Sequence, residues 1–138
     1  MWRRTRQDLF DFGNRRYNFI KLIHGDAHDL PFGDGFFDLV VCAEVLEHVK
    51  DPGRVLLEIK RVLRKDGRAI VEMDSGNFLF KVSWCWWTKI KKGVWRDAHV
   101  HLFNTKKLEK EILKSGFKIK RKFFFNFTMG VAFLLEKK

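Results

Sequence analysis

The segment from residue 37 to residue 73 alternates two short apolar runs with one amphipathic stretch, and this alternation limits the fold more than any other feature. Residues 37–42 and 68–73 are largely aliphatic, which is typical of strands buried on both faces of a parallel sheet. Between them, Asp51 is a suitable helix N-cap and Pro52 suits the first helical position. Two parallel strands joined by one helix form a right-handed α/β unit, so the sequence predicts an α/β fold.

The same rules of periodicity predict the remaining elements. A third apolar run, at residues 19–24, predicts a further parallel strand. The helix that starts at Pro52 is predicted to run until Gly67, and Thr105 is predicted to cap a second helix that ends at Gly116. Two more strands are expected at residues 117–123 and 129–135, joined as an antiparallel pair through a turn at residues 126–128.

The composition indicates one globular domain. The chain has 138 residues, of which 46% are hydrophobic and 33% are charged, and no apolar run approaches the ~20 residues of a membrane-spanning helix. The basic start is not followed by the apolar core of a signal peptide, so we expect a cytoplasmic protein. Cys42 and Cys85 both lie in apolar sequence, and we expect two buried, reduced thiols that do not act as nucleophiles.

The net charge of +11 is unevenly distributed along the chain. Residues 1–50 hold seven basic and eight acidic side chains, whereas residues 51–138 hold twenty-one basic and nine acidic ones. The positive field therefore belongs to the C-terminal part. Residues 75–104 show no clear period, which is typical of a functional loop, so we expect a lid or an acceptor-side insertion there.

The residues that follow the apolar runs are the first candidates for a ligand site. In open α/β sheets, ligands bind just beyond the carboxyl ends of the parallel strands. Gly25 permits close approach of the backbone, the Asp26 carboxylate can accept from an exocyclic amine, and the Ala27 N–H can donate to a ring nitrogen. Together, Asp26 and Ala27 have the groups needed to recognise the edge of an adenine.

Several ordered segments carry a family resemblance. They are GDAHDLPF at residues 25–32, FDLV at 37–40, EH at 47–48 and the helix with its following turn at 52–67. In this order they resemble class I S-adenosylmethionine-dependent methyltransferases of the type 11 methyltransferase-domain group. The resemblance implies a Rossmann-like fold, S-adenosylmethionine as cofactor, and methyl transfer to a small-molecule or lipid-like acceptor. It also implies a cofactor-binding role for Gly25, Asp26, Ala27, Cys42, Ala43 and Glu44.

The family pattern also predicts what this chain lacks. The glycine-rich loop, the first helix and the acidic residue that ends the second strand should all precede residue 20, and residues 1–19 are too short to replace them. We therefore expect residues 1–138 to form a single, incomplete domain without the first strand-helix-strand, with residues 1–19 as an atypical segment. Its exposed sheet edge could be covered by a second copy of the chain, giving a homo-oligomer.

A second class of function stays open for the same reason. Without the cofactor loop, the chain is also consistent with a non-catalytic methyltransferase-like module. In that case the basic C-terminal half would bind a protein partner, nucleic acid or a membrane surface.

Glu44, Glu47 and His48 are spaced at i, i+3 and i+4, which on a helix places two carboxylates and an imidazole on one face. Some similar methyltransferases use such residues to hold a divalent metal beside the acceptor hydroxyl, while many more carry them without a metal. The sequence leaves open a metal site or a structural role for His48.

His99 and His101 would point the same way from an extended segment. Similar methyltransferases often have a histidine here, at the acceptor side, which predicts a catalytic general base. A structural hydrogen bond to the loop is the alternative. The aromatic stretch at residues 78–87 is open to three interpretations: a lid helix packed on the sheet, an apolar acceptor pocket, or an interfacial surface.

Overall fold

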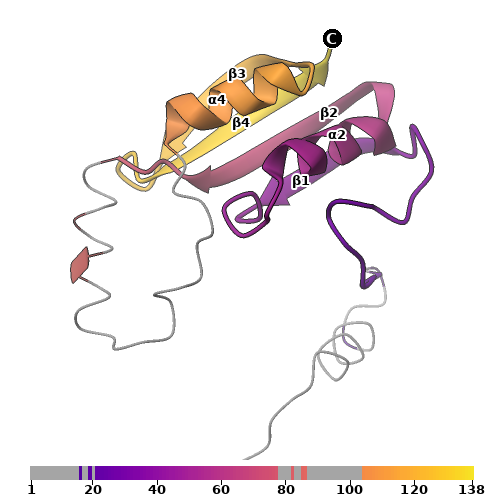
Figure 1. Cartoon of the computed structure of the whole chain (residues 1–138), viewed down its shortest axis with the longest axis horizontal. Coiled ribbons are helices and arrows are strands. Elements are labelled where there is room, and N and C mark those ends of the chain that lie inside the picture. Colours follow the sequence, from indigo (N-terminus) through magenta and orange to yellow (C-terminus); the bar gives the residue numbers. More distant parts are fainter. Residues whose placement is uncertain (1–15, 17–18, 20, 78–81, 83–84, 87–103) are drawn as a thin grey trace, which may run out of the picture.

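The computed structural model describes residues 16, 19, 21–77, 82, 85–86 and 104–138 (Figure 1). In chain order, the helices and strands are β1 (Phe37–Ala43), α2 (Pro52–Val62), β2 (Leu63–Asp74), α4 (Thr105–Lys114), β3 (Phe117–Phe125) and β4 (Gly130–Lys137). None of the helices in these ranges is long and apolar enough to cross a membrane.

The strands form one mixed sheet in the order β1-β2-β4-β3. β1 and β2 run parallel, with Val41 opposite Ile70, and α2 connects them. β4 is antiparallel to both β2 and β3. The predicted parallel strand-helix-strand unit and the predicted C-terminal antiparallel pair are therefore confirmed.

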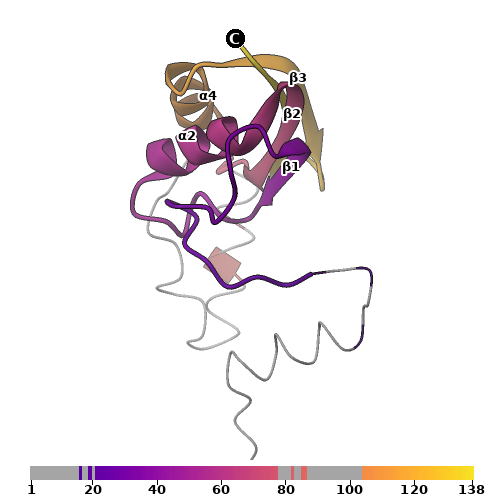
Figure 2. The same ribbon diagram turned by 90° about the vertical axis from the view of Figure 1, so that its right-hand side faces the viewer.

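Both helices lie on the same face of the sheet (Figure 1, Figure 2). The helices contribute the buried residues Val55, Leu56, Ile59, Leu108 and Ile112, and the strands contribute Ala69, Val71, Phe133 and Leu135. On the opposite face, the β1 side chains Leu39 and Val41 are exposed. The core thus occupies one side of the sheet in the part of the chain that is described.

The first helix starts where the sequence predicts but ends earlier. α2 stops at Val62, before the predicted end at Gly67. Leu63 has an extended backbone (φ −75°, ψ 140°) and pairs with Phe37 of β1, so it begins β2 instead of continuing the helix. The predicted helix end is wrong because pairing with a distant strand outweighs the local helical periodicity.

The second helix is displaced by one residue from its predicted start. The Asn104 side chain accepts a hydrogen bond from the Lys107 N–H at 2.9 Å, so Asn104 is the N-cap and the predicted cap at Thr105 is wrong. The Thr105 hydroxyl instead donates to the Ser75 carbonyl at 3.2 Å. This bond holds the start of α4 next to the end of β2. Gly116 follows the helix with φ +77°, a conformation that favours glycine.

The predicted strand at residues 19–24 is wrong, because residues 21–25 have no strand structure. Leu22 and Ile23 are exposed. A strand needs a hydrogen-bonded neighbour, and among the described strands β1 pairs with β2 only. An apolar run alone therefore does not make this segment part of the sheet.

Two further predictions concern segments that are described only in part. Residues 1–15 and most of the predicted lid at residues 75–104 lie outside the described residues.

Cys42 is buried as predicted, whereas Cys85 is exposed, so the prediction of two buried thiols is wrong for Cys85.

Candidate functional site

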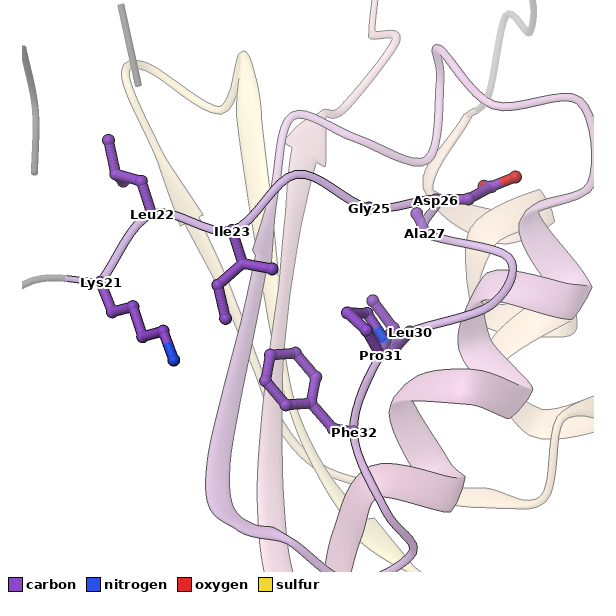
Figure 3. Close-up of a pocket in the computed structure, with 9 residues that line it drawn as sticks. All are labelled: Lys21, Leu22, Ile23, Gly25, Asp26, Ala27, Leu30, Pro31 and Phe32. Carbon is purple, nitrogen blue, oxygen red and sulfur yellow. The ribbon is translucent and has the colours of Figure 1, made fainter. Parts of the chain in front are cut away.

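A cavity of about 440 Å³ lies beside the turn that follows Gly25 (Figure 3). Its lining consists of Lys21, Leu22, Ile23, Gly25, Asp26, Ala27, Leu30, Pro31 and Phe32. Figure 3 shows the side chains of Ile23, Pro31 and Phe32 turned toward one another. Gly25, Asp26 and Ala27, three of the predicted cofactor-binding residues, therefore line one cavity together with apolar side chains.

The Asp26 carboxylate is held by its own turn. Its Oδ1 accepts a hydrogen bond from the His28 N–H at 2.9 Å and lies 2.7 Å from His28 Nδ1. The Asp26 carbonyl accepts from the Asp29 N–H at 3.1 Å. The bond from the His28 backbone is the main reason that the pKa of Asp26 lies below its ordinary value. In Figure 3 the carboxylate is directed away from Ile23 and Phe32.

His28 connects this turn to the first helix. Its Nε2 lies 3.4 Å from the Asp51 N–H group, while its Nδ1 faces Asp26. A neutral imidazole that donates from Nδ1 and accepts at Nε2 satisfies both contacts. The Arg54 side chain also donates to the His28 carbonyl at 3.2 Å. The turn is thus fixed against the N-terminus of α2, whose N-cap is Asp51 as predicted.

A buried carboxylate of α2 holds the other wall of the cavity. Glu58 is only 5% exposed. Its Oε2 accepts from the Leu30 N–H at 2.9 Å and from Arg61 Nη2 at 2.8 Å, and its Oε1 accepts from Arg61 Nε at 2.9 Å. These bonds, chiefly those from the Arg61 side chain, lower the pKa of Glu58 from 4.5 to about 2. The carboxylate is therefore ionised at neutral pH.

Arg61 completes this anchor. Its Nη1 donates to the Phe32 carbonyl at 2.8 Å and to Asp34 Oδ1 at 2.9 Å, and its Nη2 donates to the Leu30 carbonyl at 3.0 Å. The planar guanidinium can serve all of these acceptors because its donors have a fixed fork geometry. One turn of α2 therefore fixes the loop from Leu30 to Asp34.

The predicted residues after β1 lie in a different environment. Cys42 is a core residue, and burial, with a smaller contribution from the Glu47 charge, raises its pKa to about 12. Ala43 is exposed, and Glu44 has φ +53° and donates from its N–H to the Glu72 carbonyl at 3.1 Å. None of Cys42, Ala43 and Glu44 is among the described lining residues of the cavity. Their cofactor-binding role stays a prediction.

The predicted metal ligands do not share a helical face, because residues 44–48 form a bend and a turn instead of a helix. Glu47 is 2% exposed, neither of its oxygens accepts a hydrogen bond, and its Oε1 lies 3.8 Å from His48 Nε2. Throughout the described ranges, no three His, Cys, Asp or Glu side chains gather closely enough to hold a metal ion. The helical geometry on which the metal prediction for Glu44, Glu47 and His48 depended is wrong.

His99 and His101, the predicted catalytic residues, lie outside the described residues. Most of the aromatic stretch at residues 78–87 does as well. Their roles stay predictions.

Sequence reasoning assigned no role to three residues that form the site: His28, Glu58 and Arg61. The available signal was the position of Glu58, which is charged and yet stands next to the buried Ile59 in an amphipathic helix. An i, i+3 arginine then offers a partner for such a carboxylate. The hydrogen bonds from Glu58 and Arg61 to residues 30–34 could be identified only in the tertiary structure.

The methyltransferase-domain family matches residues 3–71, which is half of the chain. The chain belongs to the methyltransferase-domain family. The matched stretch contains the cavity lining, β1, α2 and most of β2. The resemblance seen in the sequence is confirmed.

Curated relatives of this methyltransferase-domain chain are much longer. The demethylmenaquinone methyltransferase of Thermotoga maritima is 36% identical over 63 residues, which cover 46% of this chain and 28% of the relative. An uncharacterized protein of Methanocaldococcus jannaschii is 39% identical over 64 residues, which cover 46% of this chain and 31% of the relative. The chain thus matches less than a third of the length of these relatives.

Solved structures confirm the fold. A crystal structure from Thermotoga maritima, described as a SAM-dependent methyltransferase and possible histamine N-methyltransferase, has a TM-score of 0.69 and 25% identity, and the match covers 89% of this chain and 67% of that one. A Pyrococcus horikoshii protein has a TM-score of 0.72 at 18% identity, with 96% and 66% covered. This methyltransferase-domain chain has the Rossmann-like methyltransferase fold, and the family implies S-adenosylmethionine as its cofactor.

Proposed function

We propose that this chain takes part in methyl transfer from S-adenosylmethionine to a small-molecule or lipid-like acceptor. The observation that carries the proposal is the cavity beside Gly25, because it combines apolar walls with the two polar groups that an adenine edge needs. The family supports the same cofactor.

The residues of the cavity suit the adenine end of that cofactor. Ile23 and Phe32 offer apolar surface for the faces of a purine ring. Both contacts from His28 use Asp26 Oδ1, so Oδ2 is left to accept a hydrogen bond from the exocyclic amine. The Ala27 N–H can donate to a ring nitrogen. Since the Asp26 carboxylate is directed away from the cavity centre, we place the amine at the rim.

Orientation is the main task of these residues. When bound, S-adenosylmethionine supplies a methyl group on a sulfonium that leaves readily, so little acid-base chemistry is required of the protein. Asp26 and Ala27 would set the position of the ring, while Glu58 and Arg61 keep the cavity wall in place through their bonds to the loop. We assign Cys42, Ala43 and Glu44 to the cofactor side, and His99 and His101 to the acceptor side, where one of them would act as general base.

The proposed acceptor class rests on the names of relatives. One is a demethylmenaquinone methyltransferase and one is described as a possible histamine N-methyltransferase. These names support a small-molecule acceptor and, in the first case, a lipid-like one.

A second copy of the chain is a further part of this proposal. β1 forms one edge of the sheet, and its Leu39 and Val41 side chains are exposed. Parallel strands are usually covered on both faces. We propose that a homo-oligomer covers this edge and face.

Binding of S-adenosylhomocysteine, measured by calorimetry, tests the proposed function. Replacing Asp26 by alanine removes a hydrogen bond to an amine, and we expect affinity to fall roughly ten- to a hundred-fold. Asp29→Ala is the matched control, because Asp29 belongs to the same turn. This variant should bind S-adenosylhomocysteine with unchanged affinity. The melting temperature of both variants should stay close to that of the parent chain.

Two outcomes would contradict the proposal. Equal binding by Asp26→Ala would remove the adenine role of this residue. Absence of binding by the parent chain, in every assembly that it forms, would instead favour the non-catalytic module.

A further inference from the structure

The turn between β3 and β4 carries a large apolar side chain in an unusual position. Phe127 is 88% exposed and has φ +53°. Its neighbours Asn126 and Thr128 also have positive φ values, of 49° and 68°. A left-handed backbone is unfavourable for phenylalanine, and exposure of its ring to water brings no gain in folding. Neither the core nor the turn therefore explains a phenylalanine at this position.

Two more aromatic side chains are exposed in the strand that leads into this turn. Phe123 and Phe124 of β3 are 48% and 51% exposed. We call Phe123, Phe124 and Phe127 the aromatic tip. Phe123 and Phe124 are consecutive in β3, so their rings point to opposite faces of the hairpin, one on each side of its end. Large apolar side chains exposed at one end of the molecule are typical of a surface that binds an apolar partner.

The turn between β3 and β4 lies at the end of the sheet where β1 and β2 finish (Figure 1). The Asn77 side chain donates to the Thr128 carbonyl at 2.7 Å, and the Ser75 N–H donates to the Met129 carbonyl at 2.7 Å. These bonds join the turn to the residues that follow β2. The tip is thus on the side of the molecule where ligands of such folds bind.

Exposed basic side chains lie on α4, whose start is held at the same end of the sheet by the bond from Thr105 to Ser75. The first turn contains no acidic residue. Lys106 lies there and shares a helix face with Lys110, and both are exposed. Positive charge at a helix N-terminus and like charges four residues apart both oppose helix formation. Helix stability therefore does not explain these lysines.

A third lysine connects the helix with the aromatic tip. Lys122 Nζ lies 2.5 Å from Glu109 Oε1 of α4 and 5.1 Å from the centre of the Phe124 ring. Over residues 104–138 the chain holds ten basic and three acidic side chains, so the whole region is strongly positive. An occupant of this surface must be both apolar and negatively charged.

We propose that the aromatic tip, with Lys106 and Lys110 of α4, docks on the surface of an anionic phospholipid bilayer. The three phenylalanine rings enter the interface between headgroups and acyl chains, and the lysines contact anionic headgroups. A bilayer fits better than single-stranded nucleic acid, because aromatic platforms for bases line a charged groove, whereas Phe127 is exposed in the turn between β3 and β4. Docking would turn the ligand side of the sheet toward the membrane.

Flotation of the full chain with vesicles tests this surface, and the test does not depend on methyl transfer. We expect binding to vesicles that mix phosphatidylserine with phosphatidylcholine, and much weaker binding to phosphatidylcholine alone. Phe127→Ser should lower the partition coefficient by roughly tenfold or more, because one inserted ring is lost. The double variant Lys106→Gln and Lys110→Gln should lower it between roughly five- and thirtyfold.

Matched controls lie at the opposite end of the sheet. Phe36 is 57% exposed, just before β1, and Phe36→Ser should leave vesicle binding unchanged. The double variant Lys65→Gln and Lys118→Gln removes two exposed lysines from the same far end and should have a smaller effect than the α4 pair.

Three results would overturn the proposal. The first is the absence of the parent chain from the floating fraction of anionic vesicles. The second is an equal loss of binding in the control variants, measured on samples whose melting temperatures match that of the parent. The third is binding of a single-stranded oligonucleotide that Phe127→Ser weakens, without any binding to vesicles.

Discussion

At the scale of single residues, the cavity depends on Glu58, a carboxylate that is not among its described lining residues. Glu58 accepts hydrogen bonds from Leu30 and Arg61, and Arg61 in turn holds the carbonyls of Leu30 and Phe32. A buried charge is tolerated only where it is paired and hydrogen-bonded, and Glu58 satisfies both conditions. The shape of the cavity wall therefore depends on ionisation of one side chain.

We expect Glu58→Gln to lower the free energy of unfolding at pH 7 by about 2 to 3 kcal/mol, because bonds to a charged acceptor are lost. The pKa of Glu58 is about 2 in the folded chain against an ordinary 4.5, so its contribution is complete above pH 4.5 and is lost as the pH falls toward 2. The difference in the free energy of unfolding between parent and variant, measured by urea unfolding, should therefore decrease as the pH falls from 4.5 toward 2.

The control is Glu111→Gln in α4, where the carboxylate forms a surface pair with Lys114 at 3.0 Å. This change should lower the free energy of unfolding by less than about 1 kcal/mol at any pH, since ion pairs on the surface contribute little to stability. If Glu58→Gln lowers the free energy of unfolding by the same amount from pH 7 to strongly acidic pH, the stabilising role of the ionised Glu58 carboxylate is contradicted.

At the scale of elements, the hairpin of β3 and β4 combines a strained turn with close packing beside it. Phe125 pairs across the strands with Gly130, and a Cβ atom on Gly130 would lie 2.3 Å from the Phe125 ring. The ring covers the backbone of the opposite strand, which only glycine permits at this distance. The start of β4 therefore depends on one glycine.

Gly130→Ala should lower the free energy of unfolding by about 1 to 2 kcal/mol, because the Phe125 ring must rotate away from its partner strand. Phe125→Leu combined with Gly130→Ala should recover part of this loss, which a double-mutant cycle from urea unfolding measures. A single Gly130→Ala variant as stable as the parent would show that the ring is not packed on the glycine.

At the scale of the whole molecule, the sheet is covered by helices on one face only within the described part of the chain (Figure 2). β1 stands at the edge with Leu39 and Val41 exposed, while its other face contributes Cys42 to the core. An uncovered edge strand with apolar side chains tends to pair with another chain. This arrangement is the basis of the proposed homo-oligomer.

Sedimentation velocity over a range of concentrations tests the homo-oligomer. The parent chain should associate at moderate salt, where the Debye length of about 8 Å screens much of its net charge of +11. Val41→Lys should shift the species toward the monomer, whereas Leu113→Lys, a change of an exposed leucine on α4, should not. A parent that is monomeric at every concentration would contradict the homo-oligomer.

The candidate site was predictable from the sequence only in outline. Gly25, Asp26 and Ala27 line one cavity, and their role in cofactor binding stays a prediction. Asp26 accepts a hydrogen bond from His28, and Arg61 of α2 donates to the Leu30 carbonyl. Whether such bonds form depends on how the loop packs against the helix. No pattern along the chain encodes such contacts, because they arise only when distant segments pack.

The sequence by itself determined the elements whose signals are local: the cap at Asp51, the amphipathic face of α2, and the alternation of β3 that precedes a turn. Each depends on residues within one or two turns of each other, so periodicity and capping suffice. Only the tertiary structure decided that residues 21–24 stay outside the sheet and that residues 44–48 bend instead of forming a helix. Strand pairing and burial join residues far apart in the chain, and their free energy exceeds the small propensities that a local pattern expresses.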